Sequence, residues 1–113
     1  MPVNETDPTG RLAHEPGAKL DSGKPMAGVL LDFGLALLEV AKVGTFGAKK
    51  YSRGGWQHVP DGVNRYTDAL MRHLLAEQGE SHDHESGLLH AAQAAWNSLA
   101  RLELMLRQEC KED

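Results

Sequence analysis

Apolar side chains recur at intervals of three and four residues along the last third of the chain. The residues that follow this spacing are Leu88, Leu89, Ala92, Trp96, Leu99, Leu102 and Leu106. This period places side chains along one stripe of an α-helix, whereas a half-buried strand needs alternation with period two. No segment of useful length alternates in that way. The sequence therefore predicts an all-α fold, with a long helix capped by Ser86 and ending at about Arg107.

Two further helices are expected before this one. The run from about Ala27 to Lys49 is rich in Val, Leu, Ala and Phe, and it is long enough for a core helix. A second helix is predicted from about Asn64 to Gln78, with Asp61 or Asn64 as its N-cap. Three such helices pack as an antiparallel bundle.

The apolar surface of these helices exceeds what one copy of the chain can bury. The first helix is apolar on most of its circumference, and the third carries Trp96, Leu102 and Met105 on more than one face. A chain of 113 residues forms one small domain with a modest core. Because large exposed apolar patches usually mark interfaces, we predict an obligate homo-oligomer, a dimer or tetramer, that completes the bundle through its first and third helices. Trp96 belongs to the core or to this interface.

The two ends of the chain differ in composition from the helical part. Residues 1–18 contain prolines and glycines and few large apolar side chains, which predicts a flexible arm. The helical domain spans residues 19–108, and residues 109–113 form a charged tail. The lone Cys110 lies in that tail, so an internal disulfide and a cysteine-based zinc site are both excluded.

Composition also narrows the location and the partners. No apolar run reaches the roughly 20 residues that span a bilayer, and the N-terminus lacks the build of a signal peptide. We therefore expect a cytoplasmic protein without a membrane partner. The formal net charge of −4 argues against binding to a nucleic-acid polymer, although a local basic patch can hold a nucleotide.

The stretch from Met71 to Asn97 concentrates titratable side chains around a polar turn marked by Gly79 and Gly87. One helical face of the first run carries His73, Glu77 and Glu80, and one face of the second carries His90 and Asn97. These faces meet if the two runs fold back antiparallel. The turn itself adds His82, Asp83, His84 and Glu85.

Carboxylates gathered at such a junction repel one another unless a cation lies between them. Mg²⁺ or Mn²⁺ prefers a few carboxylate oxygens together with water and phosphate, so Glu77, Glu80 and Asp83 are candidate ligands. Glu39, deep in the first apolar run, is either a further ligand or water-orienting group, or a partner of Lys42 or Lys49. A solvated corner without metal explains the same composition.

A basic and aromatic segment, Phe46 to Gln57, follows the first helix. Its cations can meet phosphate oxygens and its flat rings can stack on a nucleobase. The candidates are Lys49, Lys50, Arg53, Tyr51 and Trp56. Lysines at a helix C-terminus also complement the helix dipole, but the combination favours a nucleotide-like ligand. Further upstream, Lys24 beside Gly23 can approach an anion, or the segment is simply a polar loop.

Several of these segments together resemble a known family. They are Lys19-Leu-Asp-Ser-Gly-Lys-Pro25, Glu39-Val-Ala-Lys-Val, Thr45-Phe-Gly-Ala-Lys-Lys-Tyr51, Arg72-His73, Gly79-Glu80-Ser-His-Asp83-His-Glu85-Ser-Gly87-Leu, His90 and Ala95-Trp-Asn97. Over about Gly17 to Leu104 the chain resembles the phage and bacterial dATP/dGTP diphosphohydrolases. That family is similar to the all-α pyrophosphohydrolases of the MazG type and includes the MazZ enzymes of phages that replace adenine with 2-aminoadenine.

The resemblance implies an oligomeric helical bundle that binds Mg²⁺ or Mn²⁺ and cleaves a purine deoxynucleoside triphosphate to the monophosphate and pyrophosphate. The wider superfamily carries E-x-x-E and E-x-x-D pairs on two successive helices, whereas here Glu77-x-x-Glu80 and Glu80-x-x-Asp83 overlap at one junction.

For this reaction we predict three groups of roles. Glu80 and Asp83 are the main metal ligands, followed by Glu39 and Glu77, one of which orients the water as general base. Lys49, Lys50 and Arg53 neutralise the phosphates, and His73, His90 and Asn97 orient ligands or contact sugar and base. Two other classes of function fit the residues: a nucleotide-binding regulatory module without catalysis, and a structural helical interaction protein.

Overall fold

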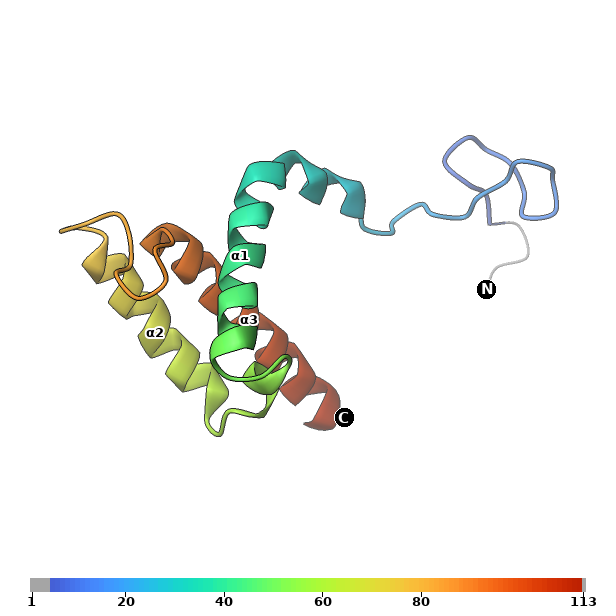
Figure 1. Cartoon of the computed structure of the whole chain (residues 1–113). Helices are drawn as coiled ribbons and strands as arrows, with labels where there is room; N and C mark the ends of the chain where they lie inside the picture. The colour runs from blue at the N-terminus through green and yellow to red at the C-terminus, as the bar shows by residue number, and fades with distance from the viewer. Residues whose placement is uncertain (1–4, 113) are drawn as a thin grey trace. The chain divides into compact units, whose positions relative to one another are not determined.

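The computed structural model describes residues 5–112 and contains three α-helices (Figure 1). In chain order the elements are the 3₁₀-helix η1 (Ala27–Phe33), α1 (Gly34–Lys50), the 3₁₀-helix η2 (Gly55–His58), α2 (Gly62–Ala76) and α3 (His90–Glu112). Within residues 5–112 the only β-pairs are two isolated bridges, Thr6 with Leu12 and His82 with Leu89. The all-α prediction is confirmed.

The chain divides into two compact units, Met1–Asp32 and Phe33–Asp113. In the first unit, the buried carboxylate of Asp7 accepts hydrogen bonds from the Thr9 hydroxyl and from the backbone amides of Thr9, Arg11 and Lys19. Burial alone would raise the pKa of Asp7, but these four bonds together lower it to about 2. The flexibility expected for residues 1–18 stays a prediction, and residues 1–4 lie outside the described part.

The first two helices differ modestly from the predicted ranges. The first apolar run begins as a 3₁₀-helix and becomes α-helical only at Gly34. Helix α2 begins at Gly62 and ends at Ala76, two residues before each predicted bound. Asp61 is its N-cap residue, but the side chain makes no capping bond to the backbone and accepts one from Asn64 Nδ2 at 2.9 Å instead.

Helix α3 begins at His90, so the prediction that Ser86 caps it was wrong. Ser86 is held in the preceding loop, where its hydroxyl donates to Asp83 Oδ2 at 2.8 Å and accepts from the Leu88 amide at 3.1 Å. The His90 amide donates to the Ser81 carbonyl at 2.9 Å. These bonds hold residues 81–89 in a loop, and α3 then runs five residues past Arg107.

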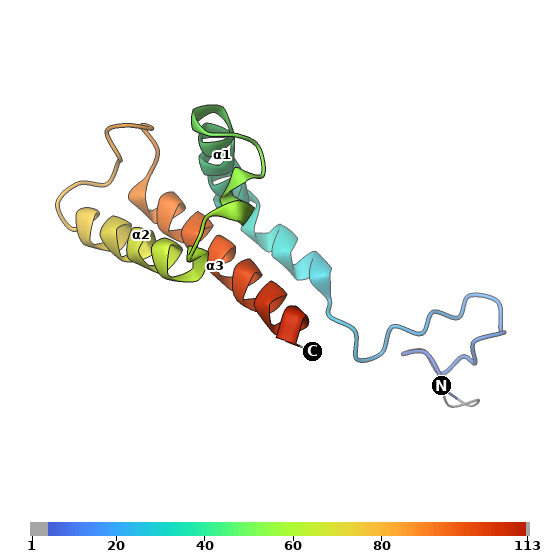
Figure 2. The same ribbon diagram turned by 90° about the horizontal axis from the view of Figure 1, so that it is seen from below.

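Helices α2 and α3 form an antiparallel pair that lies side by side in both views (Figures 1 and 2). Trp96 of α3 is the aromatic centre of the pair, because its ring makes edge contacts with Tyr66 and Trp56 at centroid distances of 5.8 Å each. The Tyr66 hydroxyl donates to the Trp56 carbonyl at 2.8 Å, and Arg101 Nε donates to Thr67 Oγ1 at 2.7 Å. Trp96 is half-buried and joins α3 to α2 and to the loop before α2.

Helix α1 packs against α3 through small residues. A Cβ atom at Gly44 would lie 3.1 Å from Trp96 Nε1, so glycine lets the two helices approach closely. Val43 is the buried residue of α1, whereas Leu35 at 88% exposure and Leu38 at 59% face solvent. No helix among residues 5–112 is long and apolar enough to cross a bilayer.

Candidate active-site cleft

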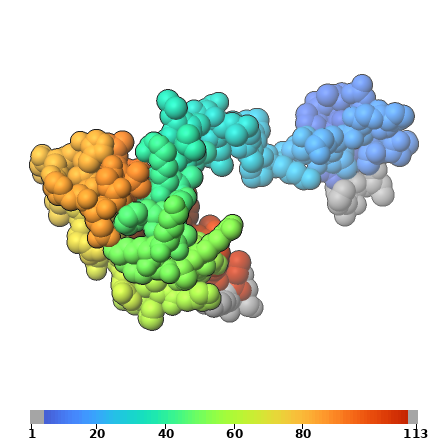
Figure 3. Space-filling model, in the orientation of Figure 1, coloured from blue at the N-terminus to red at the C-terminus, as the bar shows by residue number. Residues whose placement is uncertain are grey.

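A cleft of about 1070 Å³ opens where the end of α1 and the loop after it face α2 and α3. In the space-filling view the end of α1 and that loop (green) lie next to the loop that precedes α3 (orange; Figure 3). The polar and aromatic residues lining the cleft are Thr45, Lys49, Lys50, Tyr51, Ser52, Arg53, Trp56, Tyr66, Arg72, His73, Asp83, Glu85, Gln93, Trp96 and Asn97. Eight of the predicted site residues thus share one cleft.

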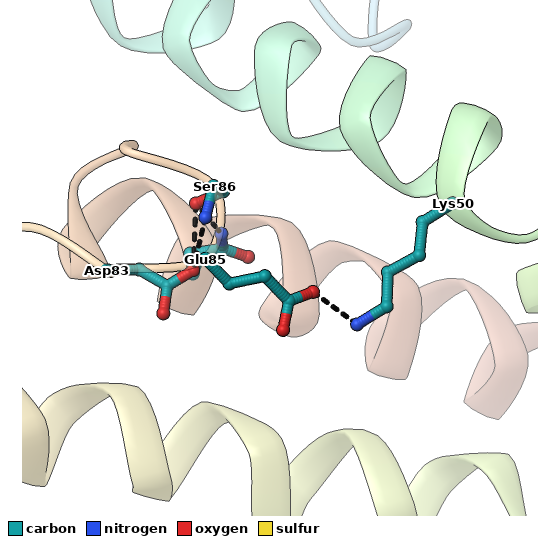
Figure 4. A network of polar contacts seen from close by, with 5 residues as sticks. Lys50, Asp83, Glu85 and Ser86 are labelled. Carbon is teal, nitrogen blue, oxygen red and sulfur yellow. Dashed lines mark hydrogen bonds and ion pairs between the residues drawn. The ribbon is translucent and has the colours of Figure 1, made fainter.

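Cations line the α1 side of this cleft. Lys50 reaches across to Glu85 and forms an ion pair that joins α1 to the loop before α3 (Figure 4). The hydrogen bond to Glu85 raises the pKa of Lys50, so the ammonium stays charged at neutral pH. Lys50 Nζ also lies 5.1 Å from the centroid of the Tyr51 ring, and Arg107 Cζ lies 5.5 Å from the centroid of the Trp56 ring. Both are cation–π contacts.

Asp83 is the predicted metal ligand that lines the cleft. Its Oδ2 atom accepts from the Ser86 hydroxyl at 2.8 Å and the Ser86 amide at 3.1 Å (Figure 4). Partial burial would raise the pKa of Asp83, but the two bonds from Ser86 and the nearby His73 and His90 lower it below 3.8. Asp83 is therefore a fixed anion at neutral pH.

His73 of α2 and His90 of α3 form a pair, with their Nδ1 atoms 2.9 Å apart. His90 is 5% exposed, and its Nε2 atom is buried without a hydrogen-bond partner in the described part of the chain. His73 lines the cleft, while His90 does not. The antiparallel return of the chain thus brings the predicted histidine faces together.

This pair predicts a loss of stability in mild acid. Partial burial, and then the neighbouring His90, lower the pKa of His73 below 6.5, against an opposing pull from Asp83. The unfolded chain therefore takes up the proton first, so the free energy of unfolding is highest above pH 6.5 and falls as the pH drops below it. Urea unfolding between pH 7.5 and 5.5 measures the slope, which should flatten in His73→Gln. An equal slope in that variant would contradict the assignment.

The other predicted carboxylates do not join Asp83. Glu39 pairs with Lys42 at 2.7 Å, as one interpretation of the sequence expected, and Glu80 pairs with the exposed His84 at 2.9 Å. Glu77 is exposed at the end of α2 and outside the cleft. In the part of the chain that the structure describes, no three His, Cys, Asp or Glu side chains form a group that could hold a metal ion. Lys24 belongs to the other compact unit.

The polar residues to which sequence reasoning gave no site role include Arg72 and Gln93 in the cleft and Ser86 in the loop beside it. Arg72 adds a fourth cation, and Gln93 and Ser86 link the loop to α3. Gln93 lies three residues after His90 and four before Asn97, so the helical spacing that selected those two also points to it. Ser86 was read as a helix cap, which hid its contact with Asp83.

The comparisons with known proteins agree with the resemblance seen in the sequence. The family described as "dATP/dGTP diphosphohydrolase, N-terminal" matches residues 14–113. A dATP/dGTP diphosphohydrolase of Salmonella phage PMBT28 is 43% identical over 81 residues, which make up 70% of this chain and 26% of that protein. This chain therefore spans only about a quarter of the length of that relative. No solved structure matches this chain. The match over residues 14–113 shows that the chain belongs to the family of dATP/dGTP diphosphohydrolase N-terminal domains.

Proposed function

We propose that the cleft binds a purine deoxynucleoside triphosphate and hydrolyses it to the monophosphate and pyrophosphate. The observation that carries this proposal is the meeting of cations, aromatic rings and the anion Asp83 in one cleft of about 1070 Å³, large enough for a nucleotide. The family match and the name of the phage relative support the reaction. We also propose that the protein acts in the cytoplasm. There it would take part in the nucleotide metabolism of phages with modified-base DNA.

The chain's own groups would divide the substrate between them. Lys49, Arg53 and Arg72 would neutralise the triphosphate, whose charge increases on the leaving pyrophosphate as the bond between the α-phosphorus and the bridging oxygen breaks. Tyr51 and Trp56 would offer flat faces to the purine ring. The lowered pKa keeps Asp83 ionised at neutral pH. Asp83 is therefore better suited to orient other groups than to act as a general base.

A divalent cation stays part of the proposal, although the described chain alone does not gather a ligand set for it. Mg²⁺ is commonly bound by one or two carboxylates together with the substrate's phosphates, so a preformed cage is not required. We expect a chelator in excess to abolish turnover and Mg²⁺ or Mn²⁺ to restore it, with Zn²⁺ restoring less. Initial rates of triphosphate loss measure this, and undiminished turnover after exhaustive chelation would remove the metal from the proposal.

The active form is proposed to be a homo-oligomer. Between α1 and α3 runs an apolar groove of about 460 Å³, whose lining includes Leu37, Leu99, Leu102 and Leu106. Exposed apolar side chains of both helices continue beyond it. A second copy seated there would bury what a single chain leaves in water, and it would leave Glu39 of α1 close to a subunit boundary.

The test of the function is incubation of the full chain with each of the four deoxynucleoside triphosphates and Mg²⁺ or Mn²⁺, followed by chromatography of the products. We expect dGTP or dATP, and neither pyrimidine, to give monophosphate. Binding of nucleotides without turnover under either metal would support a regulatory module instead.

A further inference from the structure

Gln93 and Asn97 place two amide side chains at the floor of the cleft, one helical turn apart on α3. Both side chains are mostly removed from solvent, with 9% and 6% of the residue surface exposed. Burial of a polar amide is costly unless its groups find partners. The partners they do find determine which atom of each amide remains for a ligand.

Hydrogen bonds fix the orientation of both amides. Asn97 Nδ2 lies 2.8 Å from the Gln93 backbone carbonyl, which can only accept, so the atom facing it must be the donor. Gln93 Nε2 lies 3.0 Å from Ser86 Oγ. That hydroxyl already gives its proton to the anion Asp83, so it must accept from Gln93.

Each amide therefore turns its NH₂ group toward a protein acceptor and uses one of its two N–H donors there, which leaves its carbonyl oxygen without a partner in the described part of the chain. Neither Gln93 Oε1 nor Asn97 Oδ1 accepts a hydrogen bond from the described residues, and neither is shut off completely from solvent. Both residues line the cleft, so their two oxygens are acceptors that attract the N–H groups of a ligand.

We propose that Gln93 and Asn97 select guanine over adenine, an inference that rests on the proposed function of the cleft. Guanine carries two adjacent donors on one edge, N1–H and the 2-amino group, which match two acceptor oxygens. Adenine has an unprotonated N1 on the same edge, and its lone pair would face a carbonyl oxygen. A buried acceptor left without a donor costs about tenfold or more in binding.

The test compares kcat/KM for dGTP, dITP and dATP, because dITP keeps N1–H and lacks only the 2-amino group. We expect dGTP to exceed dITP by about tenfold and dATP by more. In Gln93→Met, which removes the amide at nearly constant volume, the dGTP to dATP ratio should fall about tenfold. Gln93→Glu keeps an acceptor oxygen and should retain a preference for guanine.

Equal kcat/KM values for dGTP and dATP in the wild-type protein would overturn the inference without the need for a variant. So would an equal loss for all three nucleotides in Gln93→Met, since that pattern marks a structural role. If no triphosphate is hydrolysed, the proposed function fails, yet calorimetric binding of dGMP, dIMP and dAMP still tests the selection. Tighter binding of dGMP would uphold it, and equal binding or a preference for dAMP would end it.

Discussion

Asp83→Asn should lower kcat for a purine deoxynucleoside triphosphate by about a hundredfold or more while leaving the fold intact. The amide has nearly the volume of the carboxylate, and its oxygen can still accept from the hydroxyl and amide of Ser86. What is lost is the fixed negative charge beside His73 in the cleft. Steady-state kinetics measure the loss, and circular dichroism checks the fold.

Glu85→Gln is the matched control, because it removes a neighbouring charge that is already neutralised by Lys50. Its effect should be several times smaller. Glu80→Gln should also have a small effect, because Glu80 lies outside the cleft and pairs with His84. A near-normal rate in Asp83→Asn would contradict the proposed site, and a loss in Glu80→Gln as large as that expected for Asp83→Asn would return Glu80 to it.

Leu102→Asp should convert the proposed homo-oligomer into monomers and remove most of the proposed activity. Leu102 is 50% exposed and lines the apolar groove between α1 and α3. In a symmetric interface each copy would lose about 1.5–3 kcal/mol of apolar burial and gain a charge that must be desolvated, so association should weaken by several orders of magnitude. Light scattering behind size exclusion at micromolar concentration reports the mass.

Leu75→Asp provides the comparison for this variant. Leu75 is 61% exposed on α2, outside the groove, so a charge there should leave both assembly and activity as they are. A wild-type chain that is a well-folded, fully active monomer of 12.3 kDa would contradict the proposed interface.

Local patterns in the sequence predicted the helices well and their ends less well. Periodicity fixed the identity of all three helices, and the pairing of Glu39 with Lys42 was one expected outcome, because both depend on residues close in sequence. The start of α3 was missed because Ser86 is bound by Asp83 and Leu88 in a loop, a choice that cap preferences alone do not reveal.

The cleft likewise combines features that depend on residues close in sequence with contacts between residues far apart in the chain. The joining of Lys50 to Glu85 spans 35 residues of chain and depends on how α1 packs against α3, so spacing along one helix cannot predict it. Conversely, shared helical spacing made Glu77 and Glu80 candidates together with His73. Glu77 is the C-cap of α2 and keeps helical backbone angles, but Glu80 lies beyond the end of the helix, so the helical face assumed for the two glutamates is not formed.

The most direct test of the central claim is phosphorus NMR of the full chain incubated with dGTP and Mg²⁺. Attack at the α-phosphorus predicts that the triphosphate signals give way to one signal for dGMP and one for pyrophosphate, in equal molar amounts and without orthophosphate. Orthophosphate with dGDP, or triphosphate signals unchanged under both Mg²⁺ and Mn²⁺, would contradict the proposed activity.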